Sequence, residues 1–234
     1  MLSDIILKEF DIITAHDDPY RELAESYSEA VFSSDRRKAS AIILEAVESG
    51  TAIKDIYLHV FQPSLYLIGR LWQFNIISVA QEHLFTAMTQ SIMAQLYPFI
   101  MSGLRGDKKM IATCVGSELH EIGIRMVADI FEMDGWSTLF LGAGTSSKTV
   151  VGTIDSEKPH LLAISATMNF HLPNVQNLIK EVKSSNTPGL FIMVGGGVFN
   201  ARPQLWQDIG ADGFAMDAVH ALEVADDLIK SRHS

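Results

Sequence analysis

The sequence has 234 residues, of which 47% are hydrophobic and 20% are charged, a composition typical of a folded globular protein. A formal net charge of −10 argues against unaided binding to the phosphate backbone of a nucleic acid, which favours clusters of Lys and Arg. One cysteine excludes an internal disulfide, and no apolar run has the length of a membrane span, so we expect a cytoplasmic protein.

Residues 19–101 have the apolar spacing and the capping residues of helices. A helix over residues 53–72 contains Pro63, and we expect it to bend there because proline removes a backbone hydrogen bond. The next helix opens with Ser78 and Gln81, a capping-box pair. Short connections predict an antiparallel four-helix bundle. The first dozen residues are either a loose arm or an additional amphipathic turn.

From Asp107 the pattern changes to short apolar runs, each followed by a helical segment. Five such runs are present: KKMIATCVG, STLFLG, HLLAISA, GLFIMVGG and GFAM. Strand–helix repeats of this kind predict an α/β domain with a flavodoxin-like (Rossmann-like) parallel sheet of five strands. We therefore expect two domains, a helical bundle over residues 1–104 and the sheet domain over residues 105–234.

The loop after the first predicted strand contains Glu118, His120 and Gly123 within the segment GSELHEIGIRMV. In open parallel sheets, ligands bind beyond the carboxyl ends of the strands, where the strand order reverses. A histidine there can present one ring nitrogen to a metal while the other donates to a carboxylate, a role open to Glu118. Gly123 allows a bulky group to approach the start of the helix. The alternative is a solvated loop histidine beside a helix cap.

Two further loops at the same edge of the sheet carry small or hydroxyl side chains. Ser165 and Thr167 follow the third strand, and Gly195, Gly196 and Gly197 follow the fourth. Hydroxyls beside a run of glycines leave room for a long inserted tail, and such loops also suit a nucleotide phosphate. Together with a histidine ligand, this slot indicates a metal cofactor that carries a nucleotide tail.

Residues 107–234 resemble the cobalamin-binding domain shared by methionine synthase, the corrinoid mutases and the B12-dependent light sensors. The resemblance rests on ELHEIG, SAT, GGG and the closing GADGFAMDA. It implies that His120 is the lower axial ligand of cobalt, in place of the nucleotide base, and that the base tail is buried between the sheet and a helix. Glu118 stands where many relatives have Asp, which keeps the carboxylate at a longer reach.

The helical half contains Trp72 ten residues before the pair Glu82 and His83. This W-x9-E-H pattern resembles that of the B12-dependent photoreceptor repressors, and the resemblance runs from about residue 19 to the end. It implies an adenosyl group on the upper face of the corrin, stacked on the tryptophan. Gln73 stands where the repressors have a second histidine ligand, and we expect no DNA-binding segment. The alternative is a core tryptophan beside a helix-capping carboxylate.

We assign no catalytic residue, because the sequence has no Ser/His/Asp set, Walker loop or CxxC pattern. The favoured interpretation is an adenosylcobalamin-binding light sensor that signals through self-association or a protein partner, without contacting nucleic acid or membrane. One alternative is a corrinoid carrier for a methyltransferase system, and another is a heme-binding variant of the same fold. Cys114 is expected in the core, and His171 at an exposed helix start.

Overall fold

The computed structural model describes residues 2–100, 106–185 and 187–231, with side chains from residue 8 onward in the first range. It divides into two compact units, Met1–Ile100 and Met101–Ser234. The domain boundary expected between residues 104 and 105 falls in the segment 101–105, outside the described residues. Among the described residues, no helix is long and apolar enough to cross a membrane.

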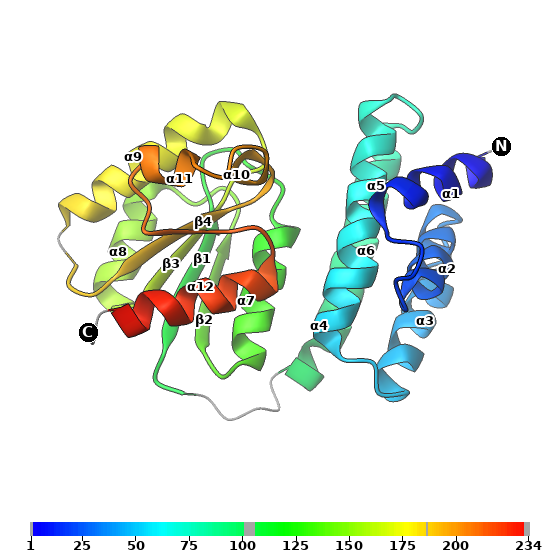
Figure 1. Ribbon diagram of the computed structural model, residues 1–234, viewed down its shortest axis with the longest axis horizontal. Helices are drawn as coiled ribbons and strands as arrows, with labels where there is room; N and C mark the ends of the chain where they lie inside the picture. The colour runs from blue at the N-terminus through cyan, green and yellow to red at the C-terminus, as the bar shows by residue number, and fades with distance from the viewer. Residues whose placement is uncertain (1, 101–105, 186, 232–234) are drawn as a thin grey trace. The chain divides into compact units, whose positions relative to one another are not determined.

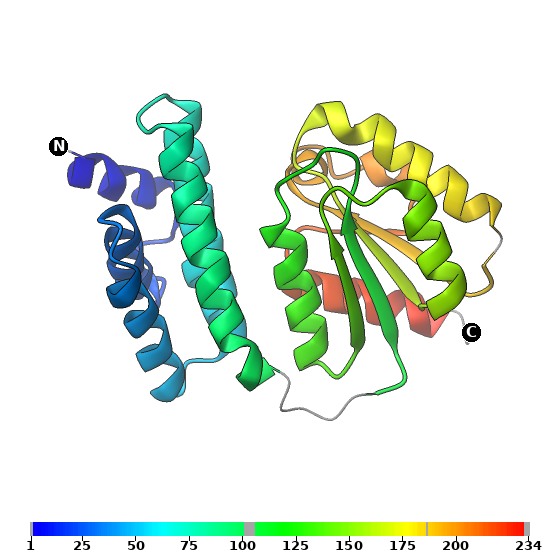
Figure 2. The same ribbon diagram turned by 180° about the vertical axis from the view of Figure 1, so that it is seen from behind.

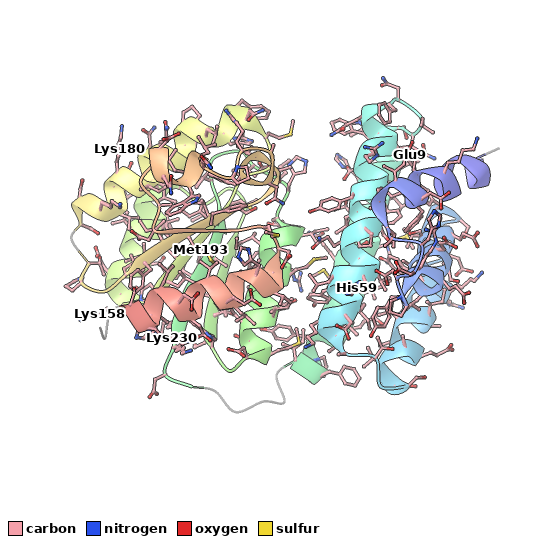
Figure 3. All side chains as sticks on the ribbon, viewed as in Figure 1. Glu9, His59, Lys158, Lys180, Met193 and Lys230 are labelled. Carbon is pink, nitrogen blue, oxygen red and sulfur yellow. The ribbon has the colours of Figure 1, made fainter. Side chains whose placement is uncertain are left out.

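The first unit is helical, and its elements are α1 Leu2–Ile13, α2 Arg21–Phe32, α3 Arg36–Glu48, α4 Ile53–Asp55, the π-helix η1 Ile56–Phe61, α5 Gln62–Gln73 and α6 Val79–Ile100. The sequence left two alternatives for the first dozen residues, a loose arm or an amphipathic turn. The structure forms the helix α1 there. Arg70 Nε of α5 donates to the carboxylate of Glu9 on α1 over 2.8 Å, which attaches α1 to the unit (Glu9 is labelled in Figure 3).

The irregularity expected at Pro63 takes the form of the π-helical segment η1, which ends two residues before the proline. Pro63 is the second residue of α5, so its missing N–H group falls directly after the change from π-helical to α-helical hydrogen bonding. The helix is thus continuous from α4 to α5, and the local change of hydrogen bonding accommodates the proline.

The second unit is an α/β domain with strands β1 Lys109–Cys114, β2 Ser137–Gly142, β3 Leu161–Ser165, β4 Phe191–Gly195 and β5 Gly213–Ala215. Its helices are α7 Ile122–Met133, α8 Ser147–Glu157, the 3-10 turn η2 Asn169–His171, α9 Leu172–Ser184, α10 Gly197–Ala201, α11 Leu205–Asp208 and α12 Ala218–Ser231. The strands are parallel in the order β2-β1-β3-β4-β5, which confirms the predicted flavodoxin-like sheet (Figure 1).

Helices cover both faces of this sheet (Figures 1 and 2). On one face, Ile111 of β1 and its neighbours pack against α8, α9 and α10. On the other face, Met110 and Ala112 of β1 pack against α7 and α12. Met193 of β4 belongs to this second layer and lies inside the unit (Figure 3). Because both faces are buried, the strands read as continuous apolar runs in the sequence.

Candidate functional site

The strand order reverses between β1 and β3, so the chain leaves these two neighbouring strands in opposite directions along the sheet. Four strands end in register, with Cys114, Ser165, Gly195 and Ala215 as successive partners across the sheet. The loops after β1 and β3 therefore start side by side. This is the position at which open α/β sheets bind ligands.

Glu118, on the loop after β1, joins the two loops. Its side chain is fully buried. Oε1 accepts the backbone N–H of His120 at 3.1 Å and also contacts the Nδ1 atom of the same residue. Oε2 accepts the backbone N–H groups of Thr167 at 2.8 Å and Met168 at 3.2 Å, on the loop after β3. The carboxylate thus holds both loops at the point where the strand order reverses.

The charge on Glu118 follows from these contacts. Burial by itself raises the pKa of the Glu118 carboxyl, but the hydrogen bonds from His120, Thr167 and Met168 outweigh burial and lower this pKa from 4.5 to about 2. The carboxylate is therefore ionised at neutral pH. An ionised acceptor at Nδ1 places a proton on that nitrogen, which makes Nε2 the ring nitrogen suited to a metal.

His120 combines this fixed ring with access from solvent. Its side chain is 51% exposed, although its carboxylate partner is fully buried. Cys114, at the end of β1, is fully buried as predicted, and its thiol donates to the backbone carbonyl of His120 at 3.7 Å. The imidazole is thus presented at the surface by a loop that is anchored in the core.

Gly123 lies in the first turn of α7 and is exposed. A Cβ atom built there would have no neighbouring atom within 4 Å, and the backbone does not adopt a positive φ. Neither packing nor backbone conformation within the protein requires a glycine at this position. The space beside Gly123 is open, and a role for this glycine in binding a bulky group stays a prediction.

Of the three glycines at the end of β4, Gly195 and Gly196 differ from the expectation of an open slot. A Cβ atom at Gly195 would lie 2.9 Å from the carbonyl oxygen of Ala215, and one at Gly196 would lie 2.6 Å from that of Ala166. Close backbone packing therefore accounts for Gly195 and Gly196 without any ligand. Gly197 is exposed and has only ordinary contacts.

Ser165 and Thr167 are both placed at the site, with different degrees of burial. Ser165 is 7% exposed, and its Oγ would lie 2.9 Å from a Cβ atom at Gly196. Thr167 is half-buried and takes part through its backbone N–H, which donates to Glu118. The loop after β3 therefore contributes backbone donors to Glu118, whereas a role of the two hydroxyls in binding a ligand stays a prediction.

Trp72, Glu82 and His83 lie in the helical unit, at the turn between α5 and α6. Trp72 is 39% exposed in the last turn of α5. Glu82 Oε2 contacts His83 Nδ1 at 2.6 Å, and Glu82 Oε1 accepts the hydroxyl of Thr86 at 2.8 Å. Trp72 is therefore not a core tryptophan. The carboxylate of Glu82 contacts the side chains of His83 and Thr86. That these residues share a ligand with His120 stays a prediction.

The start of α6 is fixed as the sequence predicts. The backbone N–H of Ser78 donates to Gln81 Oε1 at 2.9 Å, and the N–H of Gln81 donates to Ser78 Oγ at 3.3 Å. Asn75, in the turn before it, has a φ of 55°. This capping box and left-handed turn fix the backbone from which Glu82 and His83 project.

His171 was expected at an exposed helix start, and the structure corrects this. It does precede α9, but it is only 3% exposed, and its Nε2 lies 4.0 Å from Oε2 of Glu118. The ring of Phe170 lies next to it, with centroids 4.2 Å apart. No local motif marks this contact, because it joins residues from two different loops.

Comparison with known protein families gives two matches along this chain. Residues 108–225 match the family described as the B12 binding domain, and residues 23–97 match a second family with the same description. The chain belongs to the B12-binding domain family. Cobalamin is therefore the cofactor class supported by the family match.

Relatives match almost the whole chain. Monomethylamine corrinoid protein 1 of Methanosarcina acetivorans is 24% identical over 218 residues, which cover 90% of this chain and 99% of that protein. The solved structure of the Methanosarcina barkeri monomethylamine corrinoid protein has a TM-score of 0.77 at 20% identity, covers 91% of this chain and 99% of its own, and therefore has the same fold.

The resemblance to photoreceptor repressors is shorter. The HTH-type transcriptional repressor CarH of Myxococcus xanthus is 22% identical over 181 residues, which cover 75% of this chain and 59% of that protein. Membership of the B12-binding family is thus shown, whereas the finer resemblance to photoreceptors is not confirmed.

The residues at the sheet edge fit a corrinoid. His120 would hold the cobalt of such a group through Nε2, because Nδ1 contacts the carboxylate of Glu118. The open space at Gly123 leaves room for a large ring beside that histidine. Glu118, buried and ionised, is the carboxylate that would orient the imidazole.

Proposed function

We propose that this protein is a corrinoid carrier that passes a methyl group between partner methyltransferases, with His120 as the lower axial ligand of cobalt. The observation that carries the proposal is the match to a monomethylamine corrinoid protein along 90% of this chain and 99% of that relative. When bound, the cobalt of a corrinoid supplies a centre that accepts and releases a methyl group.

In this proposal the protein's own residues bind and orient the cofactor. Glu118 fixes the ring of His120 through Nδ1, Gly123 keeps the start of α7 clear, and Ser165 and Thr167 line the region where the nucleotide tail enters. Gly197 leaves the beginning of α10 accessible from solvent. A heme-binding variant is a weaker proposal, because the family match specifies B12 binding.

A light sensor that uses adenosylcobalamin is the second candidate, and a specific observation favours it. Trp72 exposes 39% of its surface beside the turn that leads to Glu82 and His83, so a flat ring and two polar side chains are available for an adenosyl group. Such a sensor would signal through self-association or a protein partner. Gln73 stands where a second histidine ligand is found in the repressors.

Ligation by His120 is tested by spectroscopic titration. Purified protein and the His120→Ala variant are titrated with methylcobalamin and with hydroxocobalamin, and the absorption spectrum of the bound form is recorded. We expect the variant to lose the spectrum of histidine-ligated cobalt. An unchanged bound spectrum would show that His120 is not the ligand.

Carrier and sensor are separated by the upper ligand and by light. A carrier should bind methyl- and adenosylcobalamin with similar affinity, and Trp72→Ala should weaken both equally. A sensor should prefer adenosylcobalamin, and Trp72→Ala should cost about 1–3 kcal/mol for this form alone. Size-exclusion chromatography of the adenosylcobalamin complex, before and after green light, completes the test, since only a sensor should change its oligomeric state or its association with a partner.

A further inference from the structure

Gly69 lies in the interior of α5, and the residues that the structure describes do not account for a glycine there. After proline, glycine is the least favourable residue inside a helix, because it loses the most conformational freedom on folding. A Cβ atom at this position would have no neighbouring atom within 4 Å, and the backbone does not adopt a positive φ. Neither packing nor backbone conformation within the described residues therefore requires it. Glycine also serves where a second molecule approaches the backbone closely.

Two exposed aromatic side chains flank this glycine on one face of α5. Tyr66, three residues before Gly69, is 50% exposed, and Trp72, three residues after it, is 39% exposed. Residues three positions apart are neighbours on a helix surface, so the missing side chain leaves a notch between the two rings. Leu67 and Leu71, on the opposite face, are fully buried. The notch therefore opens away from the core of the helical unit.

The face of α5 that contains the notch carries no charged side chain. Gln62, Leu65 and Gln73 complete it by their helical spacing, and they are half-buried or exposed. Aromatic, aliphatic and amide groups suit a flat and largely apolar ligand better than a phosphate or a bare metal ion. The corrin ring of cobalamin is such a ligand, because its edge carries methyl groups and uncharged amides. Residues 23–97, which include this face, match a B12 binding domain in their own right.

We propose that Gly69 is a contact position for the corrin ring, and that the notch between Tyr66 and Trp72 receives an edge of this ring. A side chain at position 69 would occupy the space that the ring needs. The inference rests on the proposed binding of a corrinoid and deepens it, because it assigns to the helical unit a contact that is independent of the group bound above cobalt. It applies to a carrier and to a sensor alike.

The test adds a side chain at position 69 in the whole chain. Gly69→Leu fills the notch, and Gly69→Gln replaces it if the leucine variant does not stay in solution. The matched control is Gly152→Leu, because Gly152 also lies inside a helix, α8, is exposed, and would bring its Cβ within 4 Å of no other atom. Leucine and glutamine are better helix formers than glycine, so each substitution should raise the thermal midpoint of the cofactor-free protein by about 2–4 °C.

Each protein is titrated with methylcobalamin, with adenosylcobalamin and with cobinamide, a corrinoid that lacks the nucleotide tail. We expect Gly69→Leu to raise Kd at least about tenfold, equivalent to about 1.4 kcal/mol, for all three ligands, because all three share the ring. Gly152→Leu should stay within about twofold of wild type for each ligand. A more stable cofactor-free protein that binds more weakly is the result expected of a glycine kept for a ligand.

Four results would overturn the inference. An unchanged Kd for Gly69→Leu would show that no corrinoid occupies the notch, and an equal loss in Gly152→Leu would show that the effect does not belong to this face. A loss confined to adenosylcobalamin would assign the notch to the upper ligand instead of the ring. A lowered thermal midpoint of cofactor-free Gly69→Leu would identify a packing role.

The wild-type titration separates this inference from the proposed function. If the wild-type protein binds none of the three corrinoids, the proposed function fails, and the role of Gly69 fails with it. If the wild-type protein binds them and Gly69→Leu binds them equally well, only the role of Gly69 is refuted.

Discussion

The substitution Gly196→Ala tests how the loop after β4 is built. Gly196 has φ 95° and ψ 176°, a region that is essentially restricted to glycine and costs other residues about 1–3 kcal/mol. The new Cβ atom would also lie 2.6 Å from the carbonyl oxygen of Ala166 and 2.9 Å from Oγ of Ser165. Overpacking of this kind costs a further ~1–3 kcal/mol. We therefore expect a loss of about 4 kcal/mol in the free energy of unfolding.

The matched control is Gly197→Ala. Its Cβ atom would lie 3.5 Å from its nearest neighbour, the carbonyl oxygen of Thr167, and the residue has no positive φ. Surface changes without strain stay within about 0.5 kcal/mol, and we expect the same here. Urea unfolding of both cofactor-free variants, followed by circular dichroism, measures the difference. Equal midpoints for the two variants would refute the argument that backbone packing requires Gly196.

Three further outcomes follow from the site. Gly123→Phe should leave the thermal midpoint of the cofactor-free protein nearly unchanged, because a Cβ atom there meets no other atom within 4 Å. The same variant should lose cobalamin binding in a titration. Binding as in wild type would show that Gly123 is not part of the site. Glu118→Gln should weaken cobalamin binding by about 10–100-fold, as measured by titration, and an unchanged Kd would show that its charge is unimportant. Burial raises the pKa of Cys114 to about 12. Iodoacetamide at pH 8 should therefore label the native protein at least about 10³-fold more slowly than the urea-unfolded protein, as measured by mass spectrometry. Equal labelling rates would contradict the burial of this thiol.

The architecture could be predicted because its signals are local. The central strands β1, β3 and β4 are largely buried and leave short apolar runs, and the longer helices leave a periodic pattern. The π-helix η1 was not predictable in this way, because Pro63 specifies that regular hydrogen bonding must change but not where the change occurs. Residues 1–12 were undecided for a related reason, since the attachment of α1 depends on Arg70, far along the chain.

The site was predictable where its residues share one loop. Glu118 and His120 are two positions apart, and their contact follows from that spacing. His171 was misjudged because its burial results from two loops meeting at the sheet edge. The role of a glycine is likewise hard to predict from sequence. Sequence shows that Gly123 and Gly196 lack side chains, but only the structure shows that the space is open at the first and filled by backbone at the second.

The length of the acidic side chain at position 118 explains how one residue can hold two loops of the sheet edge together. A carboxylate that orients His120 needs to reach only its own loop, yet Oε2 of Glu118 also reaches the backbone of Thr167 on the neighbouring loop. Aspartate would be one methylene shorter than glutamate, so the glutamate side chain gives this chain a longer reach toward the second loop. The orientation of His120 and the position of the loop after β3 are thereby coupled through one buried charge. Because Oε1 and Oε2 belong to one carboxylate, a change that turns the imidazole of His120 is expected to disturb the hydrogen bonds of that second loop as well.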